Sequence, residues 1–153
     1  HLTMSITSIM MYYKYLDFSI KSNNIESVNY YYIFFKSQKI PHISLLNYIL
    51  RLFNNLYKQN IDIIVLHSIS ILNCMKKNKI YLTQYTSHRL VLISLMLATK
   101  IYEDVPKLNS VWAVYGGVTL HDINIMEECI LFHLKCNLFI SKEQLLYIHK
   151  SIY

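Results

Sequence analysis

Apolar residues recur along the chain at the spacing of amphipathic helices, and the few helix-breaking residues fall between the apolar segments. This pattern predicts an all-α fold. The stretch from Ser22 to Lys39 is polar at first and then rich in Tyr, which indicates a connector or a short helix. The expected helices cover about Met4–Phe18, His42–Lys58, Asp62–Lys77, Thr83–Tyr102, Ser110–Tyr115, Thr119–Asn137 and Ser141 to the end of the chain.

The helix expected over Thr83–Tyr102 differs from the others because it is apolar nearly all round. Such a helix is predicted to lie at the centre of the bundle. The two glycines, Gly116 and Gly117, stand where a left-handed helix end is wanted. Two further helix starts are marked by sequences that resemble capping boxes, Thr119-x-x-Asp122 and Ser141-x-x-Gln144.

Composition agrees with a single helical domain. The chain has 153 residues, 54% of them hydrophobic, which supplies ample material for one core. Two Gly and two Pro are too few for an all-β protein with many tight turns. The longest apolar run, Leu90 to Ala98, is shorter than the roughly 20 residues of a membrane-spanning helix, so we expect a buried core helix there and no membrane partner.

The charge balance is moderately basic. Fifteen Lys and Arg against nine Asp and Glu give a net charge of +6, and the only basic cluster is Lys76, Lys77 and Lys79. We interpret this cluster as the solvated end of a helix, and we do not expect nucleic acid as a partner. The three cysteines are odd in number and form no C-x-x-C pair, which argues against a disulfide framework and favours a reducing compartment.

The residues that carry catalysis in other proteins form no recognisable site in this sequence. There is no glycine-rich phosphate loop, and no glutamate has the E-x-x-H spacing of a di-iron bundle. Cys129, His133 and Cys136 fall at i, i+4 and i+7, which places them on one face of the helix expected over Thr119–Asn137. Three ligands on one straight helix cannot close a tetrahedral zinc site without a further partner. We interpret them as buried thiols and a core histidine, with a metal-dependent helical enzyme as the open alternative.

Part of the sequence resembles a known family. The segment His88–Asp104 (H-R-L-V-L-I-S-L-M-L-A-T-K-I-Y-E-D) is similar to the central helix of a cyclin box. Trp112–Val118 (W-A-V-Y-G-G-V) and then Ile125–Glu127 (I-M-E) follow in the order and spacing of that family. The resemblance covers about Ile40 to Ile140 and is closest to the P/U-type cyclins, the group of the fungal phosphate-pathway cyclin.

The resemblance implies both a fold and a function. It implies a five-helix cyclin box at residues 40–140, an N-terminal helix and connector at 1–39, and a C-terminal helix at 141–153. The implied function is that of a cyclin, a non-catalytic regulatory subunit that binds and activates a cyclin-dependent serine/threonine kinase. Such a subunit needs no cofactor or metal, takes no small-molecule substrate and is expected in the cytoplasm, the nucleus or both.

The resemblance also selects two residues for the kinase contact. The family's kinase-contacting Lys matches Lys100, and its Glu matches Glu127. Helical periodicity alone leaves Glu127 and Glu128 equivalent, and it leaves open a local pairing of Lys100 with Glu103 or Asp104.

Two further features bear on the partners. The first box helix, residues 44–52 (S-L-L-N-Y-I-L-R-L), lacks the M-R-A-I-L patch with which some cyclins dock substrates. A cyclin-fold transcription or nucleic-acid-binding adaptor is the alternative function, because the same helices serve transcription factor IIB. We also expect some aromatic residues of the Tyr-rich connector to be exposed and to contribute to a partner surface, the alternative being that all are buried: Tyr30, Tyr31, Tyr32, Phe34 and Phe35.

Overall fold

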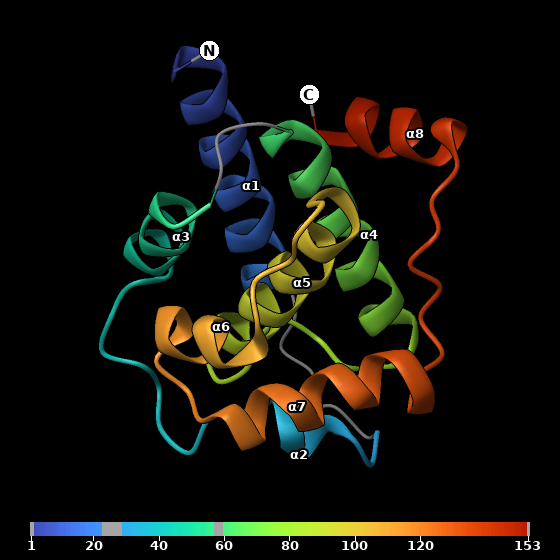
Figure 1. Cartoon of the computed structure of the whole chain (residues 1–153). Helices are drawn as coiled ribbons and strands as arrows, with labels where there is room; N and C mark the ends of the chain where they lie inside the picture. Colours follow the sequence, from blue (N-terminus) through green and yellow to red (C-terminus); the bar gives the residue numbers. More distant parts are fainter. Residues whose placement is uncertain (1, 23–28, 57–59, 153) are drawn as a thin grey trace.

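The computed structural model describes residues 2–22, 29–56 and 60–152, and within these ranges the chain forms helices and no strand, which confirms the predicted all-α class (Figure 1). None of the helices in these ranges is long and apolar enough to cross a membrane. In chain order the elements are α1 (Leu2–Ser22), α2 (Tyr32–Phe35), α3 (Leu45–Asn54), α4 (Ile61–Lys77), α5 (Ser87–Tyr102), α6 (Asn109–Gly116), α7 (Leu120–Glu128), the π-helical turn η1 (Cys129–His133) and α8 (Lys142–Ile152).

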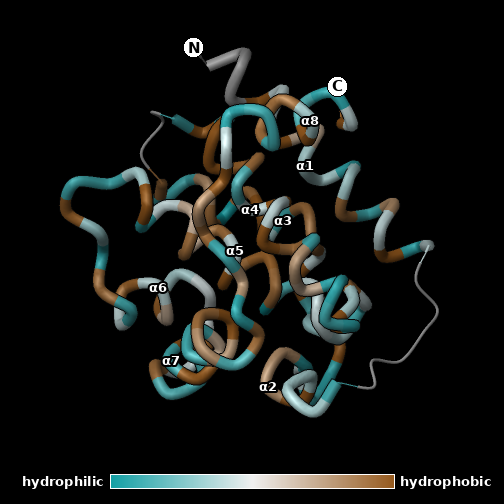
Figure 2. The backbone as a smooth tube through the Cα atoms, turned by 90° about the vertical axis from the view of Figure 1, so that its right-hand side faces the viewer, coloured by the Kyte–Doolittle hydropathy of each residue, from teal (hydrophilic) through white to brown (hydrophobic). Residues whose placement is uncertain are grey.

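Helix α5 runs through the middle of the bundle, and its neighbours cover it on every side (Figure 1). Every residue from Leu90 to Thr99 is buried. Helix α4 packs along α5 most extensively, and α3, α6 and α7 also contact it. Figure 2 shows hydrophobic segments gathered toward the centre and hydrophilic ones in the outer turns. The prediction that this helix is central is therefore confirmed.

Buried hydroxyl groups join three of these helices. The hydroxyl of Tyr12 on α1 lies 2.6 Å from Ser68 Oγ on α4, which lies 2.8 Å from Ser94 Oγ on α5. Ser94 Oγ also donates to the carbonyl oxygen of Val91 at 3.1 Å. Burial raises the pKa of Tyr12 to about 12, so its hydroxyl stays protonated and neutral. The polar groups that α5 carries into the core are thus satisfied within the core.

The predicted helix-end signals act as expected. Thr119 Oγ1 accepts a hydrogen bond from the Asp122 N–H at 3.1 Å. Ser141 and Gln144 form a reciprocal capping box, with the Ser141 N–H donating to Gln144 Oε1 at 2.9 Å and the Gln144 N–H donating to Ser141 Oγ at 3.2 Å. Gly117 ends α6 with a left-handed φ of 66°, which glycine adopts without steric cost.

Two helices are shorter than their sequence patterns predict. Helix α3 begins at Leu45 rather than His42, because Ser44 is its N-cap, and it ends at Asn54. The predicted end at Lys58 lies outside the described residues. Helix α5 begins at Ser87 rather than Thr83, because the N–H of Thr83 donates to Thr86 Oγ1 at 2.8 Å and closes a turn ahead of the helix. Apolar periodicity continues through these turns, so the pattern alone does not mark the ends.

The helix predicted over Thr119–Asn137 also ends early. Helix α7 stops at Glu128, the chain continues as the π-helical turn η1 to His133, and Lys135 then takes a left-handed φ of 51°. This turn carries Cys136 out of the helix. The predicted shared face of Cys129, His133 and Cys136 is therefore wrong.

Cys136 forms a disulfide with Cys74 in the last turn of α4. The expectation of no disulfide is therefore also wrong. The two residues are 62 positions apart, so no local spacing in the sequence marks them as a pair. Cys129 is a free, buried thiol. The disulfide ties the end of α4 to the segment that leads into α8.

Ala98 tests how tightly α5 is enclosed. The residue is 0% exposed in the middle of the bundle, so Ala98→Leu forces extra methyl groups into a filled core. We expect the free energy of unfolding to fall by about 1–3 kcal/mol in urea denaturation. The matched control Ile101→Leu, at the exposed end of the same helix, should change it by less than about 0.5 kcal/mol. Equal stability of the Ala98→Leu variant and the parent would contradict this packing.

The disulfide tests the link between α4 and the segment after η1. Cys74→Ser removes a cross-link that closes a long loop, and the unfolded chain then gains conformational entropy. In oxidising buffer we expect the free energy of unfolding to fall by about 2–4 kcal/mol. Dithiothreitol should abolish the difference between the variant and the parent, because both chains are then open. A difference of the same size in both buffers would show that the link does not stabilise the fold.

Candidate functional site

Three helices bring a lysine, an asparagine and a glutamate together, and we call Lys100, Asn109 and Glu127 the polar cluster. Lys100 lies in the last turn of α5, Asn109 is the first residue of α6, and Glu127 lies near the end of α7. The ammonium group of Lys100 donates to Glu127 Oε2 at 2.7 Å and also to Asn109 Oδ1. Asn109 Nδ2 donates to Glu127 Oε1 at 3.0 Å, so each carboxylate oxygen has its own donor.

The structure resolves the alternatives that helical spacing left open. Glu127 faces α5 and pairs with Lys100, whereas Glu128 is exposed and lies 3.9 Å from the His133 ring. Glu103, the local alternative for Lys100, instead pairs with Lys107 at 3.4 Å. The two residues that the resemblance selected therefore lie side by side. Asn109, which sequence reasoning missed, joins them, and its position just after a proline-containing loop is a signal for a helix start but not for this role.

The polar cluster is ordered but still reachable from solvent. The side chains of Lys100 and Glu127 are 27% and 21% exposed. An ammonium group has three N–H donors, and two of those on Lys100 are used within the cluster. Each carboxylate oxygen of Glu127 accepts one bond from the cluster and has room for about one more. The cluster therefore keeps one donor and free acceptor positions in a fixed arrangement.

Apolar side chains flank the polar cluster along the chain. Ile101 follows Lys100 and is 43% exposed, and Leu108 precedes Asn109 and is 72% exposed. Val105, in the loop between them, is 86% exposed. Exposed apolar residues beside an ordered charged group are typical of a surface that binds another protein.

The Tyr-rich connector forms a second exposed surface, around α2 and η1. Tyr30 is 79% exposed, whereas Phe35 is fully buried. Tyr31 stacks on the ring of His133 with 4.9 Å between the centroids, next to Phe132, which is 70% exposed. The expectation that some of these aromatic residues are exposed is confirmed, and their contribution to a partner surface stays a prediction.

The candidate metal ligands do not come together. Cys136 is in the disulfide, Cys129 is buried, and His133 is exposed rather than in the core. Within the described ranges, no three His, Cys, Asp or Glu side chains lie close enough to hold a metal ion. The interpretation of His133 as a core histidine is wrong, because the helix becomes a π-helical turn at Cys129 and the ring turns toward Tyr31.

His67 is buried and His88 is half-buried, and sequence reasoning left both without a role. The Nε2–H of His67 donates to the carbonyl oxygen of Leu138 at 2.5 Å, and its Nδ1 accepts from the hydroxyl of Tyr102 at 2.9 Å. The Nε2–H of His88 donates to the carbonyl oxygen of Ile43 at 2.8 Å. Burial lowers the pKa of both rings below the ordinary histidine value, so both are neutral at pH 7. The position of His67 within an apolar run was the available signal, whereas His88 stands between Ser87 and Arg89 and has no such signal.

A helical bundle with an ordered polar cluster on a partly apolar surface is typical of a protein-binding domain. Residues 12–138 match the family model for Cyclin, and the chain belongs to the cyclin family. The match begins within α1, ahead of the region that carried the resemblance.

The chain is similar to three curated cyclins. Cyclin-U3-1 of Arabidopsis thaliana is 31% identical over 100 residues, which are 65% of this chain and 45% of that protein. PHO85 cyclin-1 of Saccharomyces cerevisiae is 41% identical over 63 residues, 40% of this chain and 23% of that protein. PHO85 cyclin-like protein psl1 of Schizosaccharomyces pombe is 33% identical over 66 residues, 43% and 27% of the two chains. The chain thus spans less than half the length of these relatives, whose names agree with a cyclin of the P/U type.

The lowered pKa values of His67 and His88 predict how stability depends on pH. A histidine with a lowered pKa in the folded state takes up a proton more readily when the chain unfolds. Stability should therefore be constant above about pH 7 and fall as the pH drops below the ordinary histidine value of about 6.5, by at most about 1.4 kcal/mol per pH unit for each ring.

The pH dependence is measured by urea unfolding between pH 7.5 and pH 5. The variant His67→Gln, whose amide can still donate and accept, should reduce the slope. The control His121→Gln changes an exposed histidine and should leave the slope unchanged. A parent slope that His67→Gln does not alter would exclude this ring as a source.

Proposed function

We propose that this chain binds a cyclin-dependent serine/threonine kinase through the polar cluster and activates it in trans, with no cofactor and no catalysis of its own. Members of the cyclin family are regulatory subunits rather than enzymes. The observation that carries the proposal is the arrangement of Lys100 and Glu127, which are joined to each other and to Asn109 at the junction of three helices. The expected location in the cytoplasm, the nucleus or both is part of this proposal.

The chemistry of the polar cluster suits the ends of a helix in a partner. The last turn of a helix has carbonyl oxygens without partners in the helix, and the first turn has N–H groups without partners. The remaining N–H of Lys100 can donate to such a carbonyl, and the free acceptor positions of Glu127 can receive such an N–H. The exposed apolar neighbours Ile101, Val105 and Leu108 would contribute the area that a stable contact needs.

A contact of this kind can control a kinase without touching phosphate. Phosphoryl transfer in protein kinases requires a pair between the Lys of strand β3 and the Glu of the kinase C-helix. A partner that holds the C-helix in position therefore completes the active site. Two of the relatives carry PHO85 in their names, which supports a cyclin-dependent kinase as the partner. We propose that the exposed Tyr30, on the second surface around α2 and η1, also contacts the kinase.

Charge reversal within the polar cluster separates a kinase contact from a structural ion pair. Either single variant, Lys100→Glu or Glu127→Lys, places like charges together and should lower both stability and kinase activation. The double variant restores an ion pair and should recover most of the stability. The positive and negative positions are then exchanged relative to the groups of the kinase that they would contact. We therefore expect kinase activation to stay at least 30-fold below that of the parent, from a loss of about 2–5 kcal/mol in binding free energy.

The measurement uses the kinase captured with the chain from its native cells and a generic substrate peptide. The matched control is the ion pair of Arg89 and Asp122, which joins the same two helices at 3.0 Å with similar exposure. Swapping those two charges should reproduce the stability change and leave activation intact. Full activation by the stable double variant of Lys100 and Glu127 would remove the polar cluster from the contact.

A further inference from the structure

A groove of about 1180 Å³ lies between α4 and the segment that continues into α8, which run beside each other in Figure 1. Single small-molecule sites occupy roughly 300–1,000 Å³, so this groove has room for a length of extended peptide. The groove is lined by Asn73, Lys76 and Lys77 on the α4 side and by Phe139 and Tyr147 on the other. None of them belongs to the polar cluster.

Covalent and hydrogen-bonded links fix the two walls of the groove. The disulfide between Cys74 and Cys136 joins them at one point, and the bond from His67 to the Leu138 carbonyl joins them at another. The capping box of Ser141 fixes the start of α8, whose Ile148 is buried. A groove with fixed walls loses little conformational entropy when it is filled.

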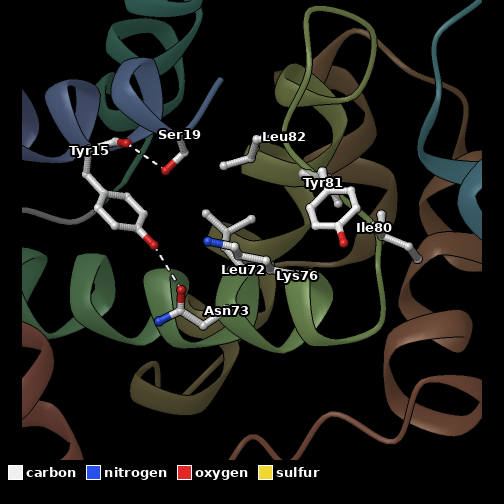
Figure 3. A pocket seen from close by; sticks show the side chains of 9 residues that line it. Tyr15, Ser19, Leu72, Asn73, Lys76, Ile80, Tyr81 and Leu82 are labelled. Carbon is white, nitrogen blue, oxygen red and sulfur yellow. Dashed lines mark hydrogen bonds between the residues drawn. The ribbon is translucent and has the colours of Figure 1, made fainter. Parts of the chain in front are cut away.

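The polar side chains of the α4 wall are positioned to donate. Figure 3 shows a separate pocket that shares Asn73 with the groove, and in it the hydroxyl of Tyr15 on α1 is directed at Asn73 and donates to Oδ1 at 2.9 Å. The Nδ2 group of Asn73 is therefore the end left to donate toward a ligand. Lys76 and Lys77 are exposed, and neither pairs with a carboxylate in the described part of the chain. Glu143 contributes the single negative charge among the lining residues, so positive charge prevails.

The opposite wall carries exposed aromatic rings. Phe139 is 77% exposed and Tyr147 is 76% exposed, and both line the groove. Large aromatic side chains left in water next to a cationic wall favour a ligand that has both apolar and negatively charged groups. The pattern differs from a simple solvated helix end, which was the sequence-based interpretation of the lysines.

We propose that this groove docks an extended acidic peptide segment with interspersed apolar side chains, as part of a protein that the bound kinase phosphorylates. Lys76 and Lys77 would pair with the carboxylates, Asn73 would donate to the peptide backbone, and Phe139 and Tyr147 would cover the apolar side chains. The inference rests on the proposed function for the identity of the docked protein. The groove and the polar cluster share no residue, and the proposal requires that kinase and peptide bind together.

The first experiment measures peptide binding to the chain alone, without a kinase. The probe is a fluorescein-labelled peptide of alternating Asp and Phe residues, and fluorescence anisotropy gives its affinity. We expect Lys76→Glu with Lys77→Glu to weaken binding at least tenfold, and Tyr147→Ala to weaken it severalfold. The control Lys14→Glu with Lys39→Glu makes the same charge change at exposed positions outside the groove and should leave the affinity unchanged.

Three outcomes would overturn the proposal. The first is equal loss of binding in the groove variant and the control variant, which would indicate general charge attraction. The second is a single-stranded oligonucleotide that binds as tightly as the peptide and depends on the same lysines, which would assign the groove to nucleic acid. The third is dimerisation in sedimentation that the groove variant abolishes, which would assign the groove to a second copy of the chain.

A second measurement keeps this inference distinct from the kinase proposal. The groove variant should still activate the kinase on a generic substrate, but it should lose its advantage on a substrate fused to the acidic peptide. The double charge swap of Lys100 and Glu127 should do the reverse, with intact peptide binding and low activation. Normal peptide binding by the chain with no activation of any kinase would contradict the proposed function and leave the groove as a peptide site.

Discussion

The burial of the middle of α5, from Leu90 to Thr99, is the constraint on which the rest of the structure depends. Every residue from Leu90 to Thr99 is buried, so the helix must be enclosed by other helices, and its polar groups must find partners inside the core. It reaches the surface only at its ends, where Arg89 and Lys100 pair with Asp122 and Glu127 of α7. Two ion pairs, one near each end of α5, therefore hold α7 against it. The candidate site lies where α5 emerges from the core at its C-terminal end.

Much of this architecture is readable from the sequence because it is encoded locally. An apolar face, a capping threonine or a glycine at a left-handed position acts within a few residues, and the centrality of α5 and the caps at Thr119 and Ser141 were predicted from such signals. Local signals did not decide between Glu127 and Glu128, nor did they identify the partner of Lys100. Helical spacing shows which residues share a face but not which helix that face meets, so only the resemblance selected Glu127 over Glu128.

The features that were missed depend on contacts between distant residues. The disulfide of Cys74 joins segments that meet only because η1 and Lys135 redirect the chain, and neither event has a short sequence signature. The same holds for Asn109, whose role exists only when α5, α6 and α7 are assembled. His67 was visible as a polar residue in an apolar run, but its two partners lie 35 and 71 positions away.

His67 links the two surfaces that carry the proposals. Its ring contacts Tyr102, two residues beyond Lys100, and the carbonyl of Leu138, next to Phe139 in the groove. A neutral imidazole can accept at Nδ1 and donate at Nε2 at the same time, and burial keeps this ring neutral by lowering its pKa. One buried side chain thus connects the end of α5 to the segment that enters α8. The polar cluster and the groove share no residue, but both rest on the same buried junction.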